Sequence, residues 1–178
     1  DDNKARTGGW VRWGSNGLGD LSIFSDFLKP AVAAGHGVRV HNLYNLYVYF
    51  WRWALWKVFE QTNASGPGVV SFISASSYLD GDAFCGMREH LRRQSDEIRI
   101  FDLGGEGRGT RKSENVFAIQ TPVAIAIAVR YGKIKKSRPA KVRYLCIDGT
   151  KSEKLKALDS IQSSHDTSAK DCIESNAL

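Results

Sequence analysis

The 178-residue sequence predicts a protein of the α/β class, and three observations carry this prediction. Short runs rich in β-branched residues, at 69–73, 97–103 and 122–131, have the length and composition of strands. Segments with helical periodicity precede the first two runs. The resulting order of helix, strand, helix, strand, strand indicates a parallel sheet that a final antiparallel hairpin strand closes.

Three helical segments are expected before the last of these strands. The first, over 21–28, is short, and Pro30 is expected to end it. The second begins at Asn42 as its N-cap and runs to about Gln61. Because this helix is apolar nearly all round, we expect it to be buried on more than one side, with its tryptophans in the core rather than stacked on bases. The third begins at Asp80.

The third strand alternates in a way that predicts how it packs. Its odd-numbered positions from Val123 to Val129 are β-branched, and the positions between them are alanines. A small-residue face lets a helix approach the sheet closely. Further along the chain, 141–147 is expected to form one more strand. Thr150 and Glu153 form a capping box that opens a helix to about 161, and the polar, Ser-rich 162–178 is expected to be disordered.

Composition narrows the functional classes. The net charge of +6 suggests a polyanionic partner, although solubility alone would also account for it. The most apolar run, 43–59, is too short to cross a bilayer, and 1–12 lacks the apolar core of a signal peptide. Three widely spaced cysteines fit no metal motif or disulfide framework, which favours a reducing cytoplasm. The start at Asp1, in a loop-like stretch, suggests a piece excised from a longer protein.

Candidate ligand loops and catalytic groups are sparse. The glycines at 14–19 follow no strand, and those at 104–109 follow a strand but precede no convincing helix start. We therefore favour a loop over the carboxyl edge of the sheet, which is where open α/β sheets bind ligands. The four histidines have no metal spacing, and no serine elbow or Cys/His pair is present. The basic run 130–143 is either a solvated linker or a phosphate contact.

Five segments occur in a fixed order: NLYNLYVYFWRWA (42–54), GVVSFISASSYLDG (68–81), FCGMREHL (84–91), EIRIFDLGG (97–105) and ENVFAIQTPVAIAIAVR (114–130). The series resembles the C-terminal portion of the catalytic domain of adenine-N6 DNA methyltransferases, of the type found in bacterial fused restriction–modification enzymes. The likeness covers roughly residues 7–161.

This resemblance implies part of a doubly wound, Rossmann-like sheet with a closing antiparallel hairpin strand. It also implies a parent enzyme that transfers a methyl group from S-adenosylmethionine to an adenine flipped out of double-stranded DNA. The family's cofactor strand and its Asn/Asp-Pro-Pro-Tyr/Phe loop do not occur in this sequence. We therefore expect the chain alone to bind no cofactor and to be inactive. The expected division is a partial catalytic domain (1–133), the start of a linker or DNA-recognition region (134–161) and a tail (162–178).

The resemblance also implies site residues, none of them catalytic and none a metal ligand. Phe117 occupies the position of an aromatic residue that stacks on the flipped base; the alternative is that it plugs the end of the sheet. The adenine pocket is expected to include Ser76, Ser77 and Tyr78. The expected contacts to DNA phosphates are Arg108, Arg111, Lys112, Lys135, Lys136 and Arg138.

The expected partners are double-stranded DNA and restriction or helicase domains of the same parent chain, with no membrane. Two alternatives stay open. One is a non-catalytic DNA-binding module, whose affinity for duplex would fall steeply with salt. The other is a truncated gene product that folds poorly, because half a doubly wound sheet exposes an apolar edge strand.

Overall fold

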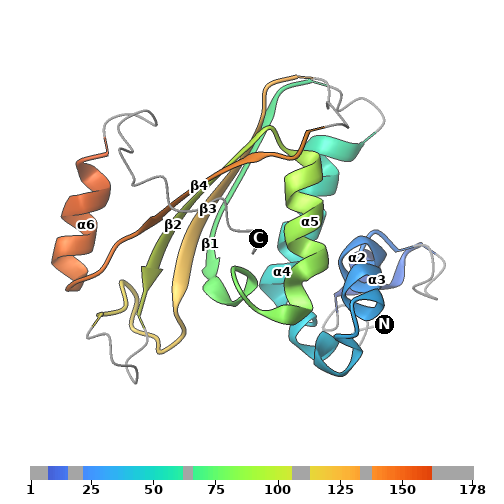
Figure 1. The fold of residues 1–178 in the computed structure, drawn as a ribbon, viewed down its shortest axis with the longest axis horizontal. Coiled ribbons are helices and arrows are strands. Elements are labelled where there is room, and N and C mark those ends of the chain that lie inside the picture. The colour runs from blue at the N-terminus through green and yellow to red at the C-terminus, as the bar shows by residue number, and fades with distance from the viewer. Residues whose placement is uncertain (1–7, 16–21, 62–65, 106–112, 133–137, 162–178) are drawn as a thin grey trace.

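The computed structural model describes residues 8–15, 22–61, 66–105, 113–132 and 138–161. Its centre is a four-stranded sheet with α4 and α5 on one face, α6 toward the other, and α2 and α3 beyond α4 and α5 (Figure 1). The helices are α2 (Gly9–Trp13), α3 (Ser25–Ala33), α4 (Leu46–Leu55), α5 (Cys85–Gln94) and α6 (Lys151–Asp159). The strands are β1 (Gly68–Ala75), β2 (Glu97–Gly104), β3 (Val123–Arg130) and β4 (Lys141–Cys146).

The sheet is mixed, with the strand order β1-β3-β2-β4. β3 pairs antiparallel with both β1 and β2, and β4 pairs parallel with β2. The α/β class and the antiparallel pairing of the last predicted hairpin strand are therefore confirmed. β3 lies between the two parallel strands, so β1, β2 and β4 all end at one edge of the sheet, where β3 begins. This carboxyl edge is marked by Ala75, Gly104, Cys146 and Val123.

The two faces of β3 pack as its alternation predicts. Ala124, Ala126 and Ala128 are buried in the main core, where Trp51 of α4 and Met87 of α5 cover them. On the opposite face, Val123 belongs to a second core with Leu103, Val116 and Ile147, against which Ala157 and Leu158 of α6 pack. The sheet therefore has a large core on the α4 and α5 side and a smaller one under α6.

Two helical predictions were wrong in detail. Pro30 lies inside α3 and does not end it. The proline removes one backbone hydrogen bond from the helix, and the buried side chains of Phe27 and Ala31 hold the helix in the core. The N-cap of α4 is Asn45, whose side chain accepts from the Tyr47 N–H at 3.4 Å. Residues 37–43, which include the predicted cap Asn42, form 3₁₀ turns.

The apolar residues of helix α4 are not all buried. Val48, Trp51 and Leu55 are fully buried, whereas Leu46 and Phe50 are exposed. The helix continues as a π-helical turn, Trp56–Glu60, so its total extent agrees with the expected end near Gln61. An all-apolar helix carries no sequence signal for which face meets the sheet, and tertiary packing makes that choice.

Candidate functional site at the carboxyl edge of the sheet

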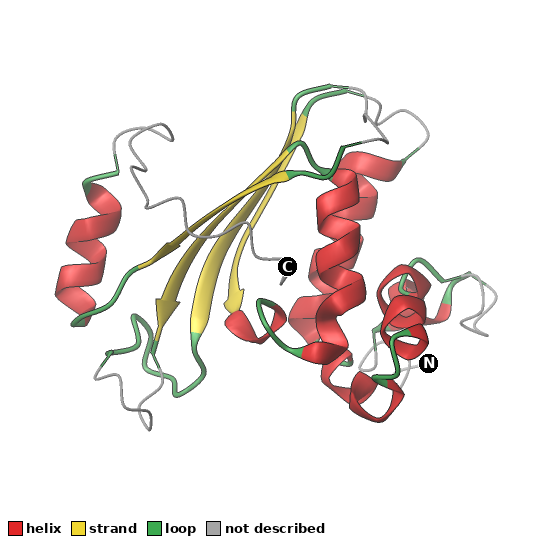
Figure 2. Cartoon of the chain, viewed as in Figure 1, coloured by secondary structure: helices red, strands yellow, loops and turns green. Residues whose placement is uncertain are grey.

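The carboxyl edge gathers the loop that follows each parallel strand. The connection after β1 contains Ser76, Ser77 and Tyr78, and the connection from β2 to β3 contains residues 113–122 (Figure 2). Ligands of open α/β sheets bind at this edge because side chains from several strand ends converge there. The 113–122 segment is called the edge loop below.

Asn115 holds the edge loop in one conformation. Its side-chain oxygen accepts from the Phe117 N–H at 3.0 Å, and its side-chain nitrogen donates to the Thr121 carbonyl at 2.7 Å. This pair of bonds closes the loop across its own width. Gly105, at the end of β2, has a φ of +109°, and a Cβ there would lie 2.7 Å from the Asn115 side-chain nitrogen. A glycine is therefore required at 105 by both conformation and space.

The edge loop points one apolar side chain inward and two outward. Val116 is buried in the second core, whereas Phe117 is 45% exposed and Ile119 is 50% exposed. At the far end of the loop, the Ser76 N–H donates to the Pro122 carbonyl at 2.9 Å and ties the loop to the end of β1. The loop thus presents Phe117 to solvent from a support that is fixed at both ends.

The three residues predicted for an adenine pocket lie at this edge but differ in accessibility. Ser76 is half-buried, and the exposed Ser77 hydroxyl lies 3.0 Å from the Tyr47 hydroxyl. The Tyr78 ring is in the main core beside Trp51, and its hydroxyl has no hydrogen-bond partner among the described residues. Burial raises the pKa of Tyr78 well above its usual value. Of the three, Ser77 is the one with an exposed polar group.

The carboxylate of Asp102, near the end of β2, makes two hydrogen bonds within the fold. It accepts from the Gly104 N–H at 3.0 Å and from the Tyr144 hydroxyl at 2.6 Å. Burial, followed by this bond to Asp102, raises the pKa of Tyr144. The carboxylate therefore joins the ends of β2 and β4.

Of the six predicted phosphate contacts, only Arg138 lies within the described residues. Arg108, Arg111, Lys112, Lys135 and Lys136 lie outside the described residues. Arg138 is exposed and precedes Lys141, which pairs with Glu97 at the opposite edge of the sheet from Phe117. The eight residues of β3 span the distance between these two edges of the sheet, which is about 25 Å at roughly 3.3 Å per residue. A phosphate held by Arg138 would therefore be several base pairs away from a base held by Phe117.

The first and last cations of the basic run 130–143 stabilise the fold. Arg130 is buried and donates to the Phe59 carbonyl at 2.7 Å and to the Gln94 carbonyl at 2.9 Å. Its guanidinium also lies over the Phe59 ring. Arg143 lies 3.0 Å from a Glu97 carboxylate oxygen. Arg130 is therefore not available to a polyanion, which the spacing of charges in the sequence does not reveal.

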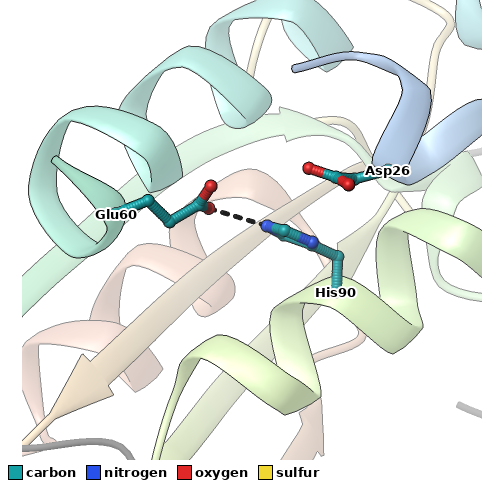
Figure 3. A group of neighbouring side chains, drawn as sticks. All are labelled: Asp26, Glu60 and His90. Atoms are coloured by element: carbon teal, nitrogen blue, oxygen red, sulfur yellow. Dashed lines mark hydrogen bonds and ion pairs between the residues drawn. The ribbon is translucent and has the colours of Figure 1, made fainter. Parts of the chain in front are cut away.

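A second cluster, away from the carboxyl edge, resembles a metal site in composition. Asp26, Glu60 and His90 place ligand atoms within 4.8 Å of one another (Figure 3). The buried Arg52 donates to Glu60 at 2.6 and 2.8 Å and to Asp26 at 2.6 Å, so a guanidinium already supplies the positive charge. Burial acts to raise the pKa of Glu60, but hydrogen bonds from His90 and Arg52 outweigh it and lower the pKa to about 2. The cluster is an ion network that joins three helical elements.

Comparison with known proteins gives matches among solved structures only. No family model matches the chain, and no curated protein does. The DrdV–DNA complex is similar over 65% of this chain, with 30% identity and a TM-score of 0.54. The Type ISP restriction–modification enzyme LlaBIII bound to DNA is similar over 78%, with 26% identity and a TM-score of 0.62. A nuclease-deletion mutant of the Type ISP restriction–modification enzyme LlaGI, in complex with a DNA substrate mimic, is similar over 81%, with 26% identity and a TM-score of 0.63.

These likenesses confirm the restriction–modification context that the five sequence segments in fixed order suggest. The chain spans only 9% to 14% of the length of the three matched chains. It is therefore similar to one segment of much larger enzymes. In the part of the chain that the structure describes, no helix has the length and apolar character needed to cross a membrane.

Proposed function

We propose that this chain forms the base-binding side of a DNA adenine-N6 methyltransferase domain, as a segment of a larger restriction–modification enzyme. The observation that carries the proposal is the braced edge loop, which exposes Phe117 at the carboxyl edge of an α/β sheet. The similarity to enzymes solved with DNA supports the same assignment. Double-stranded DNA is the proposed partner, and the remaining proposed partners are restriction or helicase domains of the same parent chain.

Phe117 would act on the energetics of base extrusion. The amino group of adenine is out of reach in a stacked duplex, so an enzyme that modifies it must unstack and unpair the nucleotide at a cost of a few kcal/mol. Stacking on an aromatic side chain returns about 1–3 kcal/mol per base. Because Asn115 already holds the loop, little loop ordering has to accompany binding. The exposed Ser77 hydroxyl is the proposed polar contact at the same edge.

The methyl donor, S-adenosylmethionine, is a proposal for the parent enzyme only. A glycine turn that cradles such a ligand needs open space beside the glycine and a helix N-terminus behind it. Beside Gly105 that space is filled by Asn115, and the next described helix of the chain, α6, begins only after two further strands. The turn at Gly105 therefore does not fit the donor, and we assign the described residues no step in methyl transfer. Isothermal titration of this chain with S-adenosylmethionine is expected to give no binding, and micromolar affinity would refute this division.

The proposal is tested by comparing two exposed apolar residues of the same loop. We expect the wild-type chain to bind a duplex with one adenine mismatched, or opposite an abasic position, more tightly than the matched duplex, because extrusion of that adenine costs less. Phe117→Ala should reduce this preference by about 5- to 140-fold, the equivalent of 1–3 kcal/mol of stacking, with matched-duplex affinity nearly unchanged. Ile119→Ala is the matched control and should retain the preference. Fluorescence anisotropy with labelled duplexes measures the two affinities of each of the three proteins.

A second candidate function is a non-catalytic DNA-binding module, which the net charge of +6 favours. This alternative predicts equal affinity for matched and mismatched duplexes and a steep fall of both with salt. Phe117→Ala would then leave the ratio of the two affinities at one. If that result is obtained, base stacking by Phe117 is excluded.

A further inference from the structure

We infer that Lys154 is a positioning residue for the edge loop, and that α6 is the element that holds Phe117 in its exposed conformation. This inference rests on the proposed function for the role of Phe117. The attachment of the edge loop by Lys154 and α6, called the clamp below, is a property of the fold. It gives a role to a helix that lies well after Phe117 in the chain.

Lys154 makes contacts that are unusual for a lysine. Its side chain is 0% exposed, and lysine is almost never fully buried unless its ammonium group is paired. Here the ammonium donates to the carbonyls of Leu103 and Glu114. Leu103 is the penultimate residue of β2, and Glu114 immediately precedes Asn115. One cation therefore joins the end of a core strand to the start of the edge loop.

Glu114 is held by two further groups at the start of α6. Its N–H donates to the Gly149 carbonyl at 3.1 Å, and its carboxylate accepts from the Lys151 N–H, the first of α6, at 2.8 Å. A carboxylate at a helix N-terminus satisfies a free N–H and interacts favourably with the helix dipole. The capping box of Thr150 and Glu153 fixes the same turn of α6. Glu114 is thus bound at its backbone N–H, its backbone carbonyl and its side-chain carboxylate.

The position of Phe117 follows from this attachment. Two residues separate it from Glu114: Asn115, which bonds the Phe117 N–H, and Val116, which is buried under α6 with Leu158. An apolar side chain at 154 would fill the same volume but would remove the ammonium donor from the Leu103 and Glu114 carbonyls. Loss of the ammonium should therefore release the start of the loop before it disrupts the sheet, because β1 to β4 retain their own backbone pairing.

The first test needs no DNA. 4-Fluorophenylalanine is placed at position 117 of the full chain, and its ¹⁹F resonance is compared in the wild type, Lys154→Met and Lys156→Met. Lys156 is an exposed lysine of the same helix and is the matched control. We expect a shifted or split resonance for Lys154→Met only. An unchanged resonance in Lys154→Met would overturn the clamp, whatever the protein binds.

The second test connects the clamp to base binding. Lys154→Met should lose the mismatch preference to the same extent as Phe117→Ala, keep its matched-duplex affinity, and add nothing to Phe117→Ala in the double variant. A preference that survives in Lys154→Met refutes positioning of a base-binding Phe117. If Phe117→Ala itself has no effect while the ¹⁹F resonance moves, the proposed function fails and the clamp stands.

A folding failure of Lys154→Met is covered by a second variant. Glu114→Ala removes the carboxylate that bonds the first turn of α6, and Glu114 is exposed, so the cores are untouched. It should move the ¹⁹F resonance in the same direction and weaken the mismatch preference. If Glu114→Ala leaves both unchanged, α6 does not hold the loop.

Discussion

Replacing Glu60 by glutamine should remove the contribution of this carboxyl group to the acid sensitivity of the fold. The Glu60 carboxylate accepts two bonds from the buried Arg52 and lies 2.8 Å from His90, and its pKa falls from 4.5 to about 2. Its side chain is only 18% exposed, so solvent screens these interactions weakly. The fall in the pKa from 4.5 to about 2 corresponds to roughly 3 kcal/mol in the free energy of unfolding, since one pKa unit is equivalent to about 1.36 kcal/mol. That is a large part of the 5–15 kcal/mol that typically separates folded from unfolded states.

The direction of the pH dependence follows from the sign of the shift. A carboxyl group whose pKa is lower in the folded protein stabilises the fold fully above its unfolded value, here 4.5. This contribution is lost as the pH falls from there through about 2. Urea unfolding of the wild type and Glu60→Gln should therefore differ by roughly 3 kcal/mol at pH 7 and converge near pH 2.

The control is Glu89→Gln, which removes an exposed pair with Arg93 on α5. Such a surface pair contributes about 0–1 kcal/mol, so this variant should track the wild type at every pH. If the difference between wild type and Glu60→Gln is as large at pH 2 as at pH 7, the Arg52 network does not lower the pKa of Glu60. The reasoning from its hydrogen bonds would then be wrong.

Three further changes probe other parts of the fold. Gly105→Ala should lower the free energy of unfolding by about 1–3 kcal/mol in urea titrations and weaken the mismatch preference, because the left-handed conformation and the Asn115 side chain both oppose a Cβ; unchanged values would show that the loop adapts. Replacing the exposed Val69 and Ile73 of the edge strand β1 by lysine should shift any self-associated chain toward monomer in size-exclusion chromatography with light scattering, and an unchanged elution would exclude this edge. Arg130→Met should lower the free energy of unfolding in urea by about 2–4 kcal/mol, because it leaves the Phe59 and Gln94 carbonyls unpaired. A loss below about 0.5 kcal/mol would contradict the assigned role.

The apolar edge of the sheet bears on the alternative of a poorly folding product. Within the described residues β1 has no strand partner on its outer side, and Phe50 and Trp53 of the neighbouring α4 are exposed. Surfaces of this kind are characteristic of interfaces or of aggregation. The lysine variants of β1 test whether this surface makes the isolated chain self-associate.

The candidate site was predictable in part. Phe117 stands out because the edge-loop segment resembles a known family, and the structure places it, exposed, at the expected edge. Lys154 carries no comparable signal, because a lysine in a polar helix is nearly always solvated. Arg52 offered one: a cation inside an otherwise apolar helix needs buried partners, and here Glu60 and Asp26 provide them.

Local chemistry in the sequence alone determined the approximate positions of the strands and of the last helix. The β-branched runs became β1, β2 and β3, the alanine face of β3 met the helices, and Thr150 with Glu153 opened α6, because each depends on residues close in the chain. Only the tertiary structure decided that β3 lies between β1 and β2, which face of α4 is buried, and that Arg138 and Phe117 lie at opposite edges. Those outcomes, like the grip of Lys154 on the edge loop, arise from contacts between residues far apart in sequence, for which local periodicity carries no information.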